Sequence, residues 1–219
     1  MLIKTADMIF ERGALKFGAF KLKLHEKNPA AAPSPFYMEL RGRDHPKKGP
    51  LEAEDFNLIA RCLLGIVLDN YFIFHGMSGI PRAGEPIVNE IARIAAKPRG
   101  FRVIPLDKKE TGNERRIVPA FNFTYRTGEK VLLIDDLVTE ADTKFEAIQA
   151  LELVGQQVVG LIVLIDREQG GKEKIEQAGY PVYSVFTISQ LFNYYLESGK
   201  INQDKYQECM DYIAANKAA

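Results

Sequence analysis

"VLLIDDLVTEADT", residues 131–143, decides the fold prediction, because it has the pattern of a buried strand that ends in two acids. Four apolar residues precede Asp135 and Asp136, and a helix-like segment follows at residues 144–155. A short apolar run of this kind is typical of a strand covered on both faces. Carboxylates at its tip suit vicinal hydroxyls or a hydrated magnesium ion. On this motif alone, a pair of solvated or helix-capping acids is an equally weighted alternative.

The alternation of strand, loop and helix extends over most of the chain. Strands are predicted at 71–77, 101–106, 130–135, 158–166 and 180–187, and helices at 51–70, 85–96, 144–155, 172–179, 188–199 and 204–216. A charged loop is predicted at 107–116. Repeated strand–helix units of this length predict an α/β fold, with a mostly parallel central sheet and helices on both faces.

The N-terminal part, about residues 1–45, has a different pattern. Helical spacing of apolar residues predicts a helix that ends near Gly13. Two strands, 20–24 and 36–41, are predicted to form an antiparallel hairpin around a proline-rich loop. We expect this hairpin to form a small hood over the carboxyl edge of the sheet. The α/β core is expected at about 50–219, and residues 1–219 are expected to form a single domain.

Composition excludes several classes of protein. The 219 residues carry 29 basic and 29 acidic side chains, whereas binding to nucleic acid driven by bulk charge requires a basic excess. No run approaches the roughly 20 apolar residues that span a bilayer. Cys62 and Cys209 lie far apart, which favours a reducing, cytoplasmic setting. His25, His45 and His75 lack metal-ligand spacing, so no protein-only metal site is predicted.

Three predicted strands are followed by polar clusters: "SGIPRAG" (78–84), "DDLVTEADT" (135–143) and "DREQGG" (166–171). The carboxyl ends of parallel strands lie along one edge of a sheet, and ligands bind there near a topological switch point. The helix that begins near Thr143 adds exposed N–H groups that favour an anion. The sequence therefore predicts one composite site at this edge.

Taken together, these residues resemble the type I phosphoribosyltransferases, and orotate phosphoribosyltransferase in particular. "VLLIDDLVTEADT" is similar to the family signature of apolar strand, two acids and a loop that closes on Thr or Ser. "ALKFGAFKLK" (14–23) and "SPFYMELRG" (34–42) resemble the hood segments of that family, and "KKET" (108–111) resembles the start of its mobile loop. "LIDREQGGKEKIEQAG" (164–179) is similar to the transferase part of UMP synthases.

The resemblance implies a reaction. Orotate and 5-phosphoribosyl pyrophosphate (PRPP), with magnesium, give orotidine 5′-monophosphate and pyrophosphate in de novo pyrimidine (UMP) synthesis. Asp135 and Asp136 would hold the ribose hydroxyls as catalytic residues, together with Lys109 of the mobile loop. Residues 139–143, here called the phosphate loop, would bind the 5′-phosphate. Arg167 would pair with the orotate carboxylate, a contact that suits a planar guanidinium.

The resemblance also implies a set of substrate contacts and a partner. The substrate-binding residues that it implies are Lys23, Phe36, Tyr37, Arg82, Lys108, Thr139, Glu140, Ala141, Asp142, Thr143 and Arg167. Magnesium would be bound mainly through the donor. The mobile loop would reach across a homodimer into the neighbouring site, and neither nucleic acid nor membrane is an expected partner.

Each of these residues has a plainer alternative. Arg167 would be a surface partner of Asp166 or Glu168 if the resemblance were set aside. Lys108 and Lys109 would be solvated loop residues. Lys23 alone carries no information, and Phe36 and Tyr37 fit a core as well as they fit the wall of a base pocket.

The chain departs from the family pattern at four places. The phosphate loop has Glu140, Ala141 and Asp142 where the family has Thr or Ser followed by glycines, which take left-handed conformations that Ala does not. An acid about 4 Å from a phosphate charge costs about 1 kcal/mol in water and about 4 kcal/mol at intermediate dielectric. Weakened donor binding is therefore expected.

The other three departures concern cations and the hood. The mobile loop is shorter and lacks a family lysine, which predicts a slow chemical step unless Arg115 or Arg116 substitutes. "RA" at 82–83 replaces the usual Tyr–Lys, and "HEKNPAAAP" (25–33) lengthens the hood turn. Two alternatives follow: an impaired paralogue that keeps nucleotide binding as a regulatory or partner subunit, and a phosphoribosyltransferase for another base.

Overall fold

The computed structural model describes residues 1–22, 30–95, 100–111 and 114–216. Its central sheet has five parallel strands in the spatial order β4 (Arg102–Val103), β3 (Gly76–Gly79), β7 (Lys130–Val138), β8 (Gln157–Asp166) and β9 (Val182–Thr187). The chain builds outward from β3 to β4 in one direction and from β7 to β9 in the other. The topological switch point therefore lies between β3 and β7, where ligands bind in open sheets of this kind.

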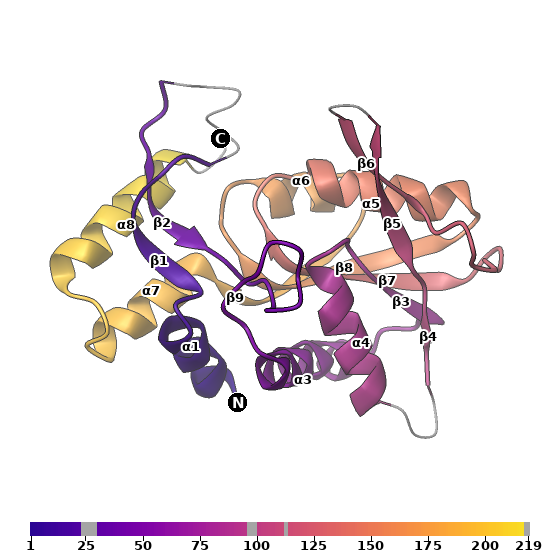
Figure 1. Ribbon diagram of the computed structural model, residues 1–219, viewed down its shortest axis with the longest axis horizontal. Helices are drawn as coiled ribbons and strands as arrows, with labels where there is room; N and C mark the ends of the chain where they lie inside the picture. Colours follow the sequence, from indigo (N-terminus) through magenta and orange to yellow (C-terminus); the bar gives the residue numbers. More distant parts are fainter. Residues whose placement is uncertain (23–29, 96–99, 112–113, 217–219) are drawn as a thin grey trace.

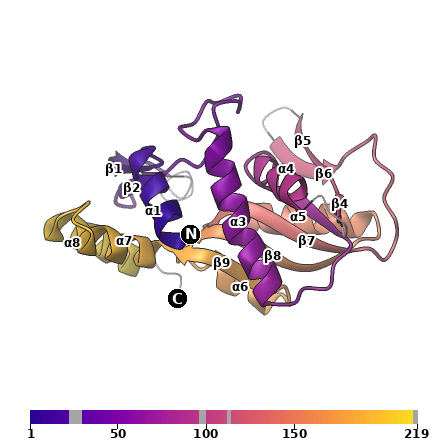
Figure 2. The same cartoon turned by 90° about the horizontal axis from the view of Figure 1, so that it is seen from below.

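Helices cover both faces of the sheet, as predicted. Helices α3 (Ala53–Asp69) and α4 (Gly84–Ile94) lie on one face, and α5 (Asp142–Leu153) and α6 (Gly171–Gln177) lie on the other (Figures 1 and 2). Strand β7 serves both layers because side chains alternate along a strand. Leu132 and Ile134 join the hydrophobic cluster with α3 and α4, whereas Val131 and Leu133 join the cluster with α5.

An N-terminal hood, formed by α1 (Leu2–Glu11), β1 (Leu15–Phe20) and β2 (Ser34–Met38), lies beside the C-terminal helices α7 (Ile188–Glu197) and α8 (Gln203–Asn216) (Figure 1). The ring of Phe36 packs on Phe192 and Tyr212, with ring centroids 5.0 and 5.9 Å apart. The buried Tyr195 hydroxyl donates to the Ala6 carbonyl at 2.8 Å. The two ends of the chain thus share one hydrophobic cluster with the sheet.

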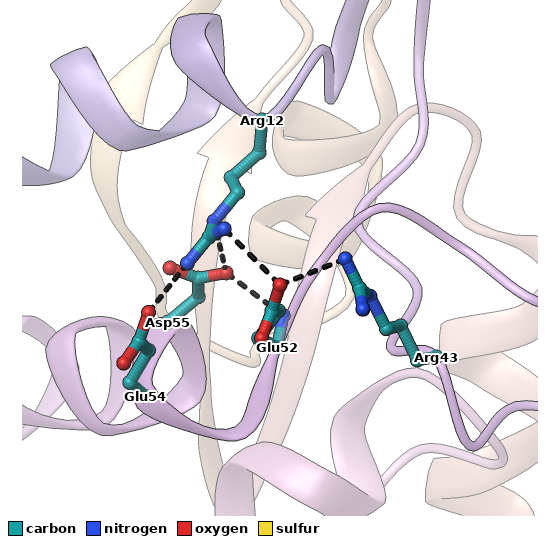
Figure 3. Close-up of polar contacts among 5 residues, drawn as sticks. All are labelled: Arg12, Arg43, Glu52, Glu54 and Asp55. Atoms are coloured by element: carbon teal, nitrogen blue, oxygen red, sulfur yellow. Dashed lines mark hydrogen bonds and ion pairs between the residues drawn. The ribbon is translucent and has the colours of Figure 1, made fainter.

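A group of ion pairs fixes the hood against the start of α3 (Figure 3). Arg12, at the end of α1, lies 2.6 Å from Glu54 and 2.8 Å from the buried Asp55. Asp55 also accepts the Glu52 backbone N–H, as in a capping box. Glu52 in turn contacts Arg43 at 2.8 Å. These contacts hold the loop after β2 beside the first turn of α3.

Several segments differ from the sequence prediction, among them strand 101–106, of which only Arg102–Val103 form β4 while Leu106 begins β5. The predicted charged loop 107–116 is largely an antiparallel hairpin of β5 (Leu106–Thr111) and β6 (Glu114–Pro119). The predicted strand 71–77 forms a sheet ladder only from Gly76, where an added Cβ would lie 2.9 Å from the Arg102 carbonyl. Strand β7 continues to Val138, through both acids, because it stays paired with β8.

The hood strands are also shifted. Observed β1 and β2 begin earlier than the predicted strands 20–24 and 36–41, and residues 23–24 lie outside the described part of the chain. Across the described ranges, no helix has the length and apolar character needed to cross a membrane.

Candidate active site

Glycines bring the loop after β3 against β7. An added Cβ at Gly84 would lie 2.2 Å from the Ile134 carbonyl, and one at Gly79 would lie 2.5 Å from the Gly84 backbone. The Ile80 N–H donates to the Ile134 carbonyl at 2.9 Å. Only glycine permits so close an approach. The exposed Arg82, which follows a cis peptide bond, is thereby placed beside the end of β7.

The two acids at the end of β7 differ in their surroundings. Asp135 is 3% exposed, and its Oδ1 accepts the Asp136 N–H at 2.9 Å while its Oδ2 accepts from Lys144 Nζ at 2.7 Å. Asp136 is partly buried, and its Oδ1 accepts the Leu137 N–H at 2.7 Å. Desolvation, and then the charge of Asp135, raise the pKa of Asp136. The buried acid is thus paired, and Asp136 lines a cavity.

The phosphate loop connects β7 to α5 without a residue of positive φ. Ala141 caps α5 with φ −84° and ψ −15° and is 2% exposed. Ala141 therefore does not take the left-handed conformation that glycines at this position of the family permit. Gly171 supports the loop from below, since an added Cβ would lie 2.3 Å from the Thr139 carbonyl. The paired glycines of "DREQGG" thus allow α6 to pack under the phosphate loop.

A cavity of about 740 Å³, here called the loop cavity, opens beside this loop. Its wall includes Thr139, Glu140, Asp142, Thr143 and Lys144. The predicted phosphate-loop residues are therefore gathered around one space, apart from the buried Ala141.

Arg167 occupies an unusual position for a cation. It is 5% exposed, and its Nε and Nη2 make no hydrogen bond within the described residues. Its guanidinium lies 5.1 Å from the ring centroid of Phe36, which is a cation–π contact. Burial lowers the pKa of Arg167 to about 10. Asp166 instead accepts the Glu168 N–H at 2.8 Å, so the alternative of a surface ion pair for Arg167 is wrong.

A second cavity, of about 650 Å³, lies toward the β5–β6 hairpin and is called the hairpin cavity. Asp136, Arg82, Lys108 and Arg115 all line it. Lys109 does not, since neighbouring residues of a strand point to opposite faces. The structure thus brings one of the two predicted lysines to this cavity, together with one of the two arginines considered as substitutes.

Tyr37 and Arg167 line both cavities and so connect them. Phe36 is 1% exposed and lies beneath Arg167, so it supports the pocket from the core instead of lining it. Lys23 lies outside the described residues.

Sequence reasoning missed several lining residues of the loop cavity, namely Lys21, Lys47, Lys144 and Gln169. Lys21 stands two residues before the predicted Lys23, and Gln169 lies inside the quoted "DREQGG". Lys144 directly follows the closing Thr143, but a lysine in the first turn of a helix is ordinarily solvated. Its burial gave no signal in the sequence.

The comparisons with known proteins agree with this geometry. Residues 77–195 match the phosphoribosyl transferase domain, and the chain belongs to that family. Among its relatives, orotate phosphoribosyltransferase of Sulfolobus acidocaldarius is 28% identical over 183 residues, which cover 84% of this chain and 85% of that protein. Orotate phosphoribosyltransferase of Pyrobaculum aerophilum is 29% identical over 206 residues, with 92% and 94% covered.

Solved structures give the same fold. UMP synthase of Leishmania donovani superposes with a TM-score of 0.76 at 26% identity, over 97% of this chain and 42% of that one. Orotate phosphoribosyltransferase of Francisella tularensis gives a TM-score of 0.69 at 20% identity, over 97% and 95%. The predicted resemblance and fold class are therefore confirmed.

Proposed function

We propose that this chain is an orotate phosphoribosyltransferase, which converts orotate and PRPP to orotidine 5′-monophosphate and pyrophosphate in pyrimidine synthesis. Relatives of that name align over most of the chain. The observation that carries the proposal is Arg167, a buried guanidinium at the junction of two cavities whose Nε and Nη2 make no hydrogen bond within the described residues.

The chemistry of Arg167 favours a planar carboxylate as its ligand. Burying a cation without a partner is costly, and a carboxylate relieves that cost by accepting two parallel N–H bonds. Orotate carries such a carboxylate on its ring. Tyr37, beside Arg167 on both cavity walls, offers an aromatic surface for the ring. A purine base has no carboxylate and would leave the guanidinium unpaired.

The donor would extend across both cavities. Its ribose would lie over Asp136, and its 5′-phosphate would lie on the phosphate loop at the N-terminus of α5. Its pyrophosphate would lie in the hairpin cavity near Arg82, Lys108 and Arg115. The bond from the anomeric carbon to pyrophosphate breaks as the bond to the orotate ring nitrogen forms; pyrophosphate leaves with the electron pair, and the proton of that ring nitrogen is released to pyrophosphate or water. The Asp136 carboxylate favours the positive charge that develops on the sugar.

Magnesium fits this arrangement as an ion carried by the donor. Mg²⁺ keeps several waters and is usually held by one or two carboxylates together with substrate phosphates. Asp136 provides a carboxylate on the cavity wall beside the proposed pyrophosphate position. When bound, the ion neutralises charge on the leaving pyrophosphate.

Two broader properties belong to the proposal. The chain would act as a homodimer in which Lys109 serves the neighbouring subunit; in support, Lys109 does not line the hairpin cavity of its own subunit. Residues 1–219 would act as one domain, because a single hydrophobic cluster joins the hood, the sheet and the C-terminal helices.

A turnover assay tests the proposed function. Purified protein is mixed with PRPP, Mg²⁺ and orotate, and the loss of orotate absorbance is followed, with Asp136→Asn as the inactive control. Turnover that requires Mg²⁺ and exceeds the control supports the proposal. Absent turnover would refute it. In that case, thermal stabilisation by orotidine 5′-monophosphate would indicate a binding protein of this fold.

A further inference from the structure

Lys144 is the one buried lysine within the described residues, and it is 6% exposed. It lies in the first turn of α5, and its Nζ donates to Asp135 Oδ2 at 2.7 Å. The exposures of the two side chains are 7% and 5%. The contact links β7 to α5 across the phosphate loop, which lies between them in the sequence. Lys144 also contributes to the wall of the loop cavity.

The pair leaves the two acids of β7 in different states. Asp135 accepts hydrogen bonds at both oxygens, from Lys144 and from the Asp136 N–H, and it lines neither cavity. Asp136 uses one oxygen for the Leu137 N–H and lines the hairpin cavity together with Arg82 and Lys108. Of the two acids, Asp136 is therefore the one available to a ligand.

We propose that Lys144 is a positioning residue that divides the work of the acid pair: it holds Asp135 out of the cavity and cancels its charge, and Asp136 alone binds the ribose hydroxyls. This inference rests on the proposed function, because it concerns the donor half of that site. It also limits the negative charge beside the donor, to which Glu140 and Asp142 already contribute. An uncompensated Asp135 would be a further negative charge near an anionic donor, and Lys144 removes it.

The test uses a paired substitution. Lys144→Met keeps most of the side-chain volume but leaves Asp135 without its cation. Asp135→Asn together with Lys144→Met removes both charges, which is a milder change than leaving one buried charge alone. Lys172→Met, on the neighbouring α6, is the matched control, since Lys172 pairs with Glu176 at 3.8 Å and lines neither cavity. Binding of PRPP with Mg²⁺, ribose 5-phosphate and pyrophosphate is measured by calorimetry.

The expected pattern is specific to the donor's sugar. Lys144→Met should weaken ribose 5-phosphate and PRPP by about tenfold or more, since the restored charge acts at short range. Pyrophosphate binding should change by less than about threefold, because its cavity is not lined by Lys144. The double variant should return to within about threefold of wild type, whereas Asp136→Asn should weaken PRPP in either background.

Each contrary outcome overturns the inference. A double variant that binds PRPP as poorly as Asp136→Asn would show that Asp135 itself contacts the sugar. Equal losses for pyrophosphate and ribose 5-phosphate would show a general structural role for Lys144. If Lys144→Met does not fold, the double variant alone decides the question. If the wild-type protein binds PRPP but does not consume orotate, orotate is refuted as the base, and the Lys144 variants still decide this inference. If the wild-type protein binds no PRPP, both the proposed function and this inference are overturned.

Discussion

Replacing Arg167 by Met separates a ligand-binding cation from a structural one. Methionine fills a similar apolar volume and keeps the contact with Phe36, but it has no charge. If Arg167 is held ready for a carboxylate, the protein bears a cost in the free state that this substitution removes. If Arg167 is structural, the substitution removes a stabilising contact.

The magnitude follows from the pKa of the buried guanidinium. A fall from 12.5 to about 10 corresponds to a cost of about 3 kcal/mol for the charged form in the folded state. A folded-state pKa below the unfolded one penalises the cation at every pH below about 10. The cation–π contact offsets about 1 kcal/mol. The free variant should therefore be more stable by about 2 kcal/mol, which raises Tm by about 4–8 °C for a chain of this size.

Binding should move in the opposite direction. Removing one partner of a buried, hydrogen-bonded charge pair costs about 2–5 kcal/mol, so the KM for orotate should rise by about 30-fold or more, since each 1.4 kcal/mol is tenfold. Differential scanning fluorimetry of the free protein and steady-state kinetics measure the two effects. Arg61→Met, on the outer surface of α3, is the matched control. A lowered Tm with an unchanged KM for orotate would refute the reasoning.

Three further predictions concern the same edge of the sheet. Gly171→Ala should displace the Thr139 carbonyl, whose contact with the new Cβ would be 2.3 Å, and raise the KM for PRPP more than that for orotate in steady-state assays. Asp142→Asn should tighten PRPP about fivefold, equal to about 1 kcal/mol of relieved repulsion; unchanged calorimetric affinity would mean that this side chain is directed away from the donor. The raised pKa of Asp136 should place the acid limb of kcat/KM above the ordinary carboxylate range, because the ionised form is required. Because desolvation penalises the ionised form of Asp136 in the folded state, the stability that Asp136 contributes at low pH is lost as pH rises through its folded-state pKa. Asp136→Asn should remove that slope from pH-dependent unfolding.

The central fold was predictable because its strands have an unambiguous pattern. In β7 and β8 the apolar runs are uninterrupted, and each is followed by polar residues at the same edge of the sheet. Covering helices on both faces explain such runs, since residues 131–134 of β7 and 161–165 of β8 are all buried. The parallel order of β3, β7 and β8 brings the segments that carry Arg82, Asp136 and Arg167 to one edge of the sheet.

The β5–β6 hairpin was not predictable in the same way. Its residues are mostly charged, and hydrophobicity therefore indicated a loop at 107–116. What makes it a strand pair is the cross-strand register, Lys108 with Ile117 and Lys109 with Arg116. Because strand side chains alternate, that register also decides that Lys108 faces the hairpin cavity and Lys109 does not. A loop prediction carries no such information.

The Asp135–Lys144 pair changes the meaning of the unusual phosphate loop. On sequence alone, Glu140 and Asp142 add negative charge where a phosphate should bind, and Ala141 removes backbone freedom. In the folded protein Ala141 takes a right-handed conformation, and Lys144, directly after the loop, pairs with Asp135, so that Asp135 adds no net charge beside the donor. The charge balance of the site therefore depends on a contact between a strand and a helix nine residues apart in the chain. The effect of acids in a phosphate loop on donor binding therefore depends on the cations that the fold brings beside them.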